Sequence, residues 1–387
     1  MLSPLILVFF AASSQLPEDP GSHQITVRDV QHYDNYYSRG NVSARVYYPS
    51  SGGPYPLVAF MHGWTGSASD YDLICEHMAS WGFVVYSNNT ETSFFGSMQP
   101  QAADTRAGLQ WVEDQSQDPN SWLFGLTANQ PWTAIGHSMG GASVAFLAMQ
   151  DARVEHAVMY EPYKGTYLGG SSAAFNWFPN YQGSLLVIGA SLDDTTDWST
   201  QVRPWFDNSN GFTRKNWMLI TGGNHYGATD NASVSGGLSG AEQHALHRRL
   251  TTTFLTSEVT DEQDAYFDFF ATTDVTFESE AHNTPVWATM NPNNPSIIEI
   301  GSFYSQNDKL RIAGSTATSF TQTAFGDLFL DTTLMRVVAS EIVGPSGLVQ
   351  RSIPISSAYS GVTLYFQALG TSATNGFLSP LNEVIVP

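Results

Sequence analysis

The stretch WTAIGHSMGGASVAF, residues 132–146, joins an apolar run to a segment with helical character. The opening WTAI favours a buried strand, and ASVAFLAMQ (142–150) favours a helix. At the junction, Ser138 has Gly136 and Gly140 two positions away on either side. Small residues let the chain turn sharply there, and such a turn lifts a hydroxyl group out at the carboxyl edge of a sheet. A turn that merely needs glycine is the alternative interpretation.

The rest of residues 24–257 alternates apolar runs with amphipathic segments, which predicts an α/β domain. Two early segments, ITVRDV (25–30) and ARVYYP (44–49), alternate polar and apolar residues as half-exposed antiparallel strands do. Continuous apolar runs suit parallel strands buried on both faces, and they are PLVAFMH (56–62), FVVYS (83–87), WTAIGH (132–137), HAVMYE (156–161), SLLVIGA (184–190) and NWMLIT (216–221). Helix-like segments between or after them are DYDLICEHMASWG (70–82), QAADTRAGLQWVEDQ (101–115) and AEQHALHRRLTTTFL (241–255). We therefore expect a mostly parallel sheet of about eight strands with helices on both faces.

The pattern changes after residue 257. Residues 272–387 hold short runs such as VTFES (275–279) and IIEIGSF (297–303), with Gly, Ser, Thr, Asn and Pro between them and no helical period. Such a pattern is typical of a β-sandwich-like domain. We therefore divide the chain into an α/β domain (24–257), a linker (258–271) and a C-terminal β-domain (272–387).

The first residues, MLSPLILVFFAASSQ (1–15), form an apolar stretch followed by small residues. The stretch is too short to span a bilayer and resembles a signal peptide without its basic n-region. We expect residues 1–20 to be a signal peptide or its remnant and the protein to be secreted, with no transmembrane segment. A buried N-terminal strand is the alternative interpretation.

Composition narrows the classes of partner. The formal charge of −20 and the pI near 4.6 disfavour nucleic acid and anionic membranes as partners. Cys75 is the sole cysteine, so an intrachain disulfide cannot form, and we expect it to lie in a helix and to pack as a small apolar residue. We expect neither a metal ion nor a cofactor, and we expect a monomer.

A serine hydroxyl becomes a nucleophile only when a base takes its proton and an acid orients that base. In chains with a Gly-x-Ser-x-Gly turn between strand and helix, the order is serine, acid, histidine. His225 lies in ITGGNHYG (220–227), directly after the last apolar run of the α/β domain, and is the predicted base for Ser138. His244 and His247 lie in a helical segment, where a solvated helix face is the expected location.

The orienting acid is expected in SLDDTTDW (191–198), which follows the strand-like run SLLVIGA. Asp193 comes first after this run and has the shortest path to His225, so it is the predicted acid. Asp194 is the alternative. Glu161, at the end of HAVMYE, is a more distant candidate.

Two backbone N–H groups are needed to hold the negative charge that develops on an attacked carbonyl. One is expected from Met139, the residue after the nucleophile, and the other from GWTG (63–66), where Trp64 is the candidate. His62 and His137 each adjoin a glycine at the end of a predicted strand. A structural role is the expected one for both histidines.

Taken in order, HGWTG, GHSMGG, GASLDD and GGNH resemble the motifs of the bacterial cutinase-like polyester hydrolases. Those enzymes are α/β-hydrolases related to dienelactone-hydrolase-like esterases, and some cleave poly(ethylene terephthalate). The resemblance covers roughly residues 40–257 and implies an α/β-hydrolase fold. It implies Ser138, Asp193 and His225 as the catalytic triad.

The resemblance also implies a substrate site. Trp64 and Met139 would form the oxyanion hole and line the ester site, and Tyr163 of EPYKG would form an aromatic wall that clamps the substrate together with Trp64. His137 stands directly before the nucleophile, where many members carry Trp or His, and is a further candidate for substrate binding. The segment 163–183 is longer than the family's usual link, and the disulfide of many secreted members cannot form here.

The sequence thus predicts a secreted serine ester hydrolase that acts on a small ester, a lipid or a polyester. A lipase or other short-chain acyl esterase of the same fold is one alternative, and a non-catalytic surface-binding protein on a hydrolase scaffold is another. For the C-terminal β-domain, attachment to a polymer or cell surface and a structural cap on the hydrolase are both open.

Overall fold

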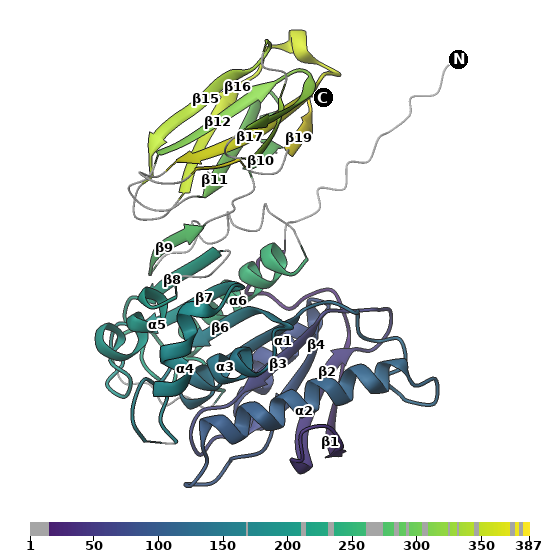
Figure 1. Ribbon diagram of the computed structural model, residues 1–387, viewed down its shortest axis with the longest axis vertical. Coiled ribbons are helices and arrows are strands. Elements are labelled where there is room, and N and C mark those ends of the chain that lie inside the picture. The colour runs from purple at the N-terminus through teal and green to yellow at the C-terminus, as the bar shows by residue number, and fades with distance from the viewer. Residues whose placement is uncertain are drawn as a thin grey trace.

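The computed structural model describes most of the chain (Figure 1). The predicted signal segment up to residue 14 and residues 261–271 of the predicted linker lie outside the described residues. Within those residues, no helix combines the length and the apolarity that a membrane crossing needs. The described residues are 15–167, 169–209, 214–230, 236–260, 274–281, 286–291, 294–303, 309–323, 326–330, 333–343, 348–371, 376–378 and 382–387.

A nine-stranded sheet forms the centre of the α/β domain, in the order β1-β2-β4-β3-β5-β6-β7-β8-β9. The strands from β4 to β8 in this order run parallel to one another, whereas the pairs β1–β2, β2–β4 and β8–β9 are antiparallel. Every strand predicted for this domain is present. The bounds are β1 (Ile25–Asp34), β2 (Gly40–Pro49), β3 (Leu57–Met61), β4 (Val84–Asn88), β5 (Trp132–His137), β6 (Val154–Tyr160), β7 (Ser184–Ala190), β8 (Arg214–Ile220) and β9 (Val275–Ala281).

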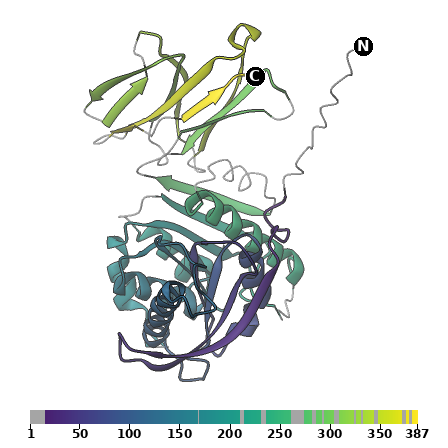
Figure 2. The ribbon, with the colours of Figure 1, turned by 90° about the vertical axis from the view of Figure 1, so that its right-hand side faces the viewer.

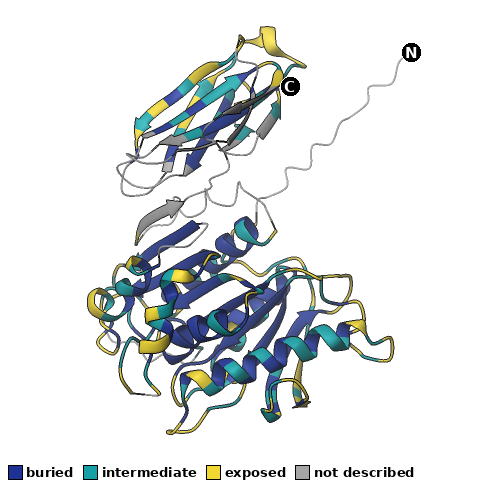
Figure 3. Cartoon of the chain, in the orientation of Figure 1, coloured by how far each residue is buried: buried dark blue, intermediate teal, exposed yellow. Residues whose placement is uncertain are grey.

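Helices cover both faces of this sheet, and the strands between them are buried (Figure 3). In β3, Leu57, Ala59 and Met61 join one core cluster, whereas Val58 and Phe60 join the other. Because successive side chains of a strand point to opposite faces, a strand with two covered faces is apolar throughout. Helices α2 and α3 pack on the first cluster, and α1 and α6 pack on the second. The helices are α1 (Asp72–Ser80), α2 (Met98–Gln117), α3 (Met139–Gln150), α4 (Ser172–Trp177), α5 (Arg203–Asp207) and α6 (Gly240–Glu258).

The strand β9 differs from the expected division of the chain. Its sequence VTFES was predicted to open the C-terminal β-domain, but β9 pairs antiparallel with β8, from Val275 opposite Ile220 to Ala281 opposite Arg214. Figure 2 shows β9, in green, lying beside the sheet of the α/β domain. Without β9, unpaired N–H and C=O groups would line the edge of β8. The sheet therefore extends beyond the predicted boundary at residue 257.

The remaining strands form antiparallel sheets around a separate core. Strands β10, β11 and β16 form one sheet, β15, β12, β17 and β18 form a second to which β19 is added, and β13 pairs with β14. Ile300 of β11 lies in one buried cluster with Ile312 of β12 and Phe366 of β17. Two sheets that share a core fit the predicted sandwich-like domain. The bounds are β10 (Val286–Met290), β11 (Ile297–Phe303), β12 (Lys309–Ser315), β13 (Thr318–Thr323), β14 (Gly326–Leu330), β15 (Arg336–Ile342), β16 (Leu348–Pro354), β17 (Thr363–Thr371), β18 (Gly376–Leu378) and β19 (Asn382–Ile385).

Some residues of the predicted signal segment contact the α/β domain. The carbonyl oxygen of Pro17 lies 2.9 Å from His77 Nε2 in α1, and Glu18 pairs with Arg249 of α6 at 2.8 Å. These two residues therefore pack with the helices that cover one face of the sheet.

The pairing of β9 generates a prediction about shortened chains. A chain that ends at Val259 retains α6 but loses β9, whereas a chain that ends at Ala281 retains both. We expect the shorter chain to unfold several degrees lower and to aggregate more readily, because the edge of β8 becomes exposed. Thermal unfolding followed by circular dichroism, together with light scattering, compares the two. Equal midpoints and equal scattering would show that the edge needs no cover.

Candidate active site

Ser138 occupies the turn between β5 and α3 with a strained backbone. Its φ of +55° and ψ of −114° lie outside the regions that non-glycine residues prefer. Such a conformation costs about 1–3 kcal/mol and persists only where the surrounding structure holds it. The N–H of Ser138 donates to the carbonyl of Tyr160 (2.9 Å), which ties the turn to β6.

Close backbone contacts explain both flanking glycines. A Cβ on Gly136 would lie 2.3 Å from the carbonyl oxygen of Gly140, and a Cβ on Gly140 would lie 2.0 Å from the carbonyl oxygen of Met61. Neither position can accept a side chain without moving the backbone. The glycines therefore let β3, β5 and α3 approach one another closely around Ser138.

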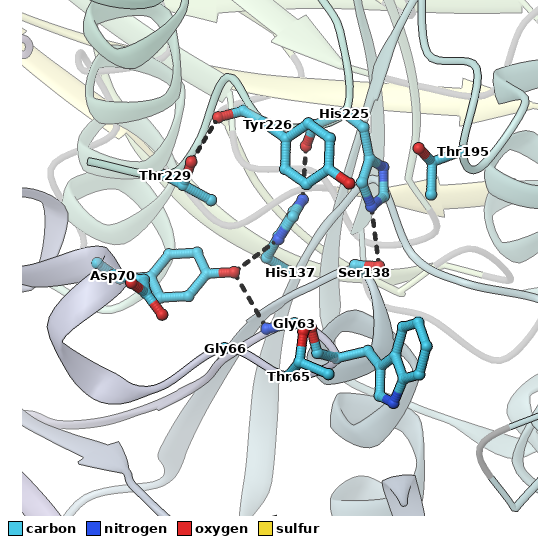
Figure 4. A pocket seen from close by; sticks show the side chains of 12 residues that line it. Gly63, Thr65, Gly66, Asp70, His137, Ser138, Thr195, His225, Tyr226 and Thr229 are labelled. Atoms are coloured by element: carbon cyan, nitrogen blue, oxygen red, sulfur yellow. Dashed lines mark hydrogen bonds between the residues drawn. The ribbon is translucent and has the colours of Figure 1, made fainter. Parts of the chain in front are cut away.

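Ser138, His225 and Asp193 form one hydrogen-bonded line, part of which is seen in Figure 4. His225 Nε2 lies 2.9 Å from Ser138 Oγ, and His225 Nδ1 lies 2.8 Å from Asp193 Oδ2. All three side chains are buried, whereas Asp194 is exposed. The structure thus brings Asp193, and not Asp194, to the imidazole. The three residues follow β5, β7 and β8, whose carboxyl ends meet at one edge of the sheet.

The backbone that follows Asp193 orients its carboxylate. Asp193 Oδ1 accepts hydrogen bonds from the N–H groups of Thr195 (2.8 Å) and Thr196 (2.7 Å), whereas Oδ2 faces both His225 and the hydroxyl of Thr196 (2.8 Å). An ionised carboxylate can only accept, so His225 Nδ1 carries a proton. In the neutral imidazole, Nε2 then accepts the hydrogen bond from the hydroxyl of Ser138.

A cavity of about 280 Å³ lies beside Ser138, and Trp64 is part of its wall. Met139 is the first residue of α3, where an N–H has no carbonyl partner within the helix. The N–H of Gly63 donates instead to the hydroxyl of Tyr71 (3.0 Å), so Trp64 stays the candidate donor of that loop. Across the described residues, no group of three His, Cys, Asp or Glu side chains is arranged to hold a metal ion.

His137 is buried and links three loops of the site. Its Nε2–H donates to the carbonyl of His225 (2.7 Å), and its Nδ1 accepts from the hydroxyl of Tyr71 (2.7 Å), which in turn accepts from the N–H of Gly63. Burial, and then the neighbouring His225, hold the pKa of His137 well below its usual value, so the ring is neutral. Although His137 borders the cavity, both ring nitrogens are engaged with protein groups, which fits the expected structural role better than substrate binding.

The aromatic wall differs from the one that the resemblance implies. Tyr163 is half-buried against the core, its N–H donates to the carbonyl of Ser138 (3.0 Å), and it is not among the residues that line the cavity. Tyr226, which sequence reasoning missed, lines the cavity and is 51% exposed. Its ring stands edge-on to that of His225 at 5.2 Å. Tyr226 directly follows the predicted base His225, and this position in the sequence could have indicated that it lines the cavity.

The expectation for His244 and His247 was wrong. Both are buried, because α6 packs this side of the helix against the sheet. His247 Nε2 lies 3.2 Å from Glu161 Oε1, so the more distant acid candidate pairs with a different histidine from the predicted base. His62 is also buried, and its Nε2 lies 2.7 Å from the carbonyl of Thr90, in keeping with a structural role.

Comparison with known proteins identifies the family of the chain. The family model described as PET hydrolase-like matches residues 12–242, which is more than half of the chain. The chain belongs to the PET hydrolase-like family. The matched range includes β1 to β8 and the three residues Ser138, Asp193 and His225.

The curated relatives are similar over part of their length. Cutinase 2 of Thermobifida cellulosilytica and cutinase cut1 of Thermobifida fusca are each 27% identical over 181 residues, 47% of this chain and 64% and 53% of their own. The bis(hydroxyethyl) terephthalate hydrolase of Streptomyces coelicolor is 23% identical over 195 residues, 49% of this chain and 57% of its own. The chain therefore matches between about half and two thirds of the length of these relatives.

Proposed function

We propose that this PET hydrolase-like chain is a secreted hydrolase of carboxylic esters, and that Ser138, His225 and Asp193 carry the reaction. The hydrogen-bonded line from Asp193 through His225 to Ser138, at the wall of a cavity, is the observation that supports it most. The apolar segment at residues 1–15 is the basis for secretion.

The distances support a two-step acyl transfer. Ser138 Oγ attacks the ester carbonyl while His225 Nε2 takes its proton, and Asp193 stabilises the imidazolium that forms. The N–H groups of Met139 and Trp64 are the proposed donors to the oxyanion, and α3 points its positive end at the same place. His225 then gives the proton to the leaving alkoxide. Water attacks the acyl-serine in the reverse sense, with His225 again as base, and frees the acid.

Polyesters are the substrate class that we propose. The relatives are named as cutinases and as a hydrolase of a terephthalate ester, and the surface beside the cavity is aromatic. Trp64 packs on Phe94 with ring centroids 4.8 Å apart, and Phe94 meets Phe95 edge-on at 5.7 Å. Phe94 and Phe95 are 66% and 88% exposed. Exposed aromatic side chains that continue from a cavity wall suit an apolar chain extending beyond the scissile ester.

The alternatives predict different behaviour. A short-chain esterase or lipase would hydrolyse soluble or emulsified esters but not a polyester film, and a surface-binding protein would bind the film without turnover. The proposed attachment role of the C-terminal β-domain would show as a loss of film binding when that domain is removed.

Ser138→Ala tests the nucleophile. We expect hydrolysis of p-nitrophenyl butyrate to fall at least about 10³-fold, because no other group can form the acyl-enzyme. A fluorophosphonate probe should label the wild-type chain at Ser138 and leave the variant unlabelled. The circular dichroism spectrum should stay unchanged. Activity retained by the folded variant would overturn the proposed nucleophile.

The two neighbouring aspartates provide a matched pair of variants. We expect Asp193→Asn to lower kcat about 10³- to 10⁴-fold, because the amide favours the wrong tautomer of His225. Asp194→Asn should keep kcat within about twofold, because its side chain is exposed and the imidazole is paired with Asp193. Steady-state kinetics on a soluble ester decides between them. The opposite ranking would make Asp194 the acid.

Phe95→Ser tests the aromatic surface. We expect release of products from an amorphous polyester film to fall about 3- to 10-fold, because an exposed ring no longer contacts the polymer. Turnover of p-nitrophenyl butyrate should be unchanged, since Phe95 does not line the cavity. Phe124→Ser is the control, because Phe124 is 58% exposed and also lies outside the cavity lining. Equal film activity in both variants would remove this surface from the proposal.

A further inference from the structure

A second acid–histidine pair lies behind the proposed triad. Glu161 directly follows β6 with a φ of +40°, and its side chain is fully buried. His247 of α6 is also fully buried, and its Nε2 lies 3.2 Å from Glu161 Oε1. His247 Nδ1 lies 2.8 Å from the carbonyl of Gln243. A buried carboxylate on a strained backbone is costly for the fold, which favours a role beyond packing.

The hydrogen bonds of this pair require a shared proton. The carbonyl of Gln243 can only accept, so His247 Nδ1 carries a proton. A hydrogen bond between His247 Nε2 and Glu161 Oε1 then needs a second proton, and a proton on the nitrogen leaves Glu161 ionised. Burial acts to lower the pKa of His247, but the charge and hydrogen bond of Glu161 outweigh it and the net shift is upward. Burial raises the pKa of Glu161, and the charge of His247 opposes this. Both shifts are in the direction that a proton held by the pair requires.

Two contacts connect Glu161 with the proposed base. Glu161 Oε2 has no hydrogen-bond partner among the described residues and lies 3.9 Å from His137 Nε2. That same Nε2–H donates to the carbonyl of His225 (2.7 Å). On the other side, the hydroxyl of Thr196 lies 2.8 Å from Asp193 Oδ2, 3.0 Å from the backbone carbonyl of Glu161 and 3.1 Å from His225 Nδ1. The side chain of Glu161 therefore adjoins His225 through His137, and its backbone carbonyl adjoins the same ring through Thr196.

We propose that Glu161, held by His247, is a positioning residue for His225: its ionised side chain, next to His137, favours the imidazolium that His225 forms during the reaction, and its backbone carbonyl holds Thr196 beside the same ring. This inference rests on the proposed function of the site. It adds a second carboxylate that acts on the base without touching substrate.

Other titratable groups also lie around Glu161 and His247. Besides His137, the carboxylate of Asp193 and the imidazole of His225 face Glu161, and the ring of Tyr160 stands edge-on to that of His247 at 5.1 Å. The hydroxyl of Tyr71 lies on the far side of His137. Asp193 already stabilises the imidazolium, so Glu161 adds to an existing attraction, and its removal should weaken catalysis without abolishing it.

Glu161→Gln is the test, since glutamine keeps the shape of the side chain and can donate to His247 Nε2. The readout is the rate at which a fluorophosphonate probe labels Ser138, measured against pH in the full chain. We expect the plateau of the labelling rate to be about 3- to 10-fold lower. We expect the acid limb of the rate–pH profile to lie about 0.5 to 1 pH unit lower, because loss of the Glu161 carboxylate makes the imidazolium of His225 less favourable. For a soluble ester, kcat should fall while KM stays within about twofold. Asp151→Asn is the control, since Asp151 is a buried carboxylate at the opposite end of α3 and should leave the limb in place.

The pH dependence of unfolding is a second readout. A raised pKa of His247 stabilises the fold below its ordinary value of 6.5, and this contribution is lost as pH rises through the folded value. Between pH 6.5 and that folded value, the wild-type folding constant should therefore fall more steeply with pH than that of Glu161→Gln, by at most about tenfold per pH unit for one proton. Should this variant not fold, His247→Gln removes the same shared proton and must also move the acid limb.

The outcomes separate the two proposals. A wild-type chain whose Ser138 is not labelled contradicts the proposed function. Normal labelling with the same plateau and acid limb in Glu161→Gln overturns the role of Glu161 and leaves the proposed function standing. If wild type and Glu161→Gln show the same slope of stability against pH, the pair holds no shared proton, and the proposed role of Glu161 is also overturned.

Discussion

The strained backbone of Ser138 is the constraint on which the site depends. A φ of +55° is unfavourable for serine, and it survives because the neighbouring backbone leaves the turn no room to relax. The close approaches at Gly136 and Gly140 join β3, β5 and α3, and the hydrogen bond to Tyr160 adds β6. Parallel strands end at one edge, so the loops after β7 and β8 reach the same point. A turn with more freedom could not keep Ser138 Oγ at 2.9 Å from the imidazole of His225.

Buried polar groups then set the positions of the loops relative to one another. The chain of hydrogen bonds from Gly63 through Tyr71 and His137 to the carbonyl of His225 is neutral and each member is satisfied. In a low dielectric, an unmade hydrogen bond of this kind costs about 1–3 kcal/mol, so the network strongly disfavours other loop arrangements. The Glu161–His247 pair differs because it contains charge or a shared proton. Its position one layer behind His137 lets it influence the base without contact with water.

The sequence predicted the parts of the molecule that follow from local pattern. Strands buried on both faces are apolar throughout, and a serine between two glycines at a strand–helix junction is typical of a nucleophile turn. The pattern could not separate Asp193 from Asp194, because only the folded turn aims the N–H groups of Thr195 and Thr196 at one of them. The sequence pattern could not predict the burial of His247. Helix α6 buries polar residues as well as apolar ones, so its buried face lacks the usual helical period of apolar residues. The pairing of β9 with β8 joins segments more than 50 residues apart, and no local pattern reports such a contact.

The net charge of the chain and the aromatic surface beside the cavity act on different steps of the proposed reaction. A chain with a formal charge of −20 gains little Coulomb energy from a neutral ester, so the proposed attraction to a polyester is apolar contact at Trp64, Phe94 and Phe95. Hydrolysis changes this balance, because each cleaved ester leaves a carboxylate beside a cavity that Asp70 also lines. Repulsion between like charges then favours departure of the acid product over that of the uncleaved ester. An acidic protein with an aromatic surface beside its cavity is therefore suited to retain a neutral polymer and to release its anionic fragments.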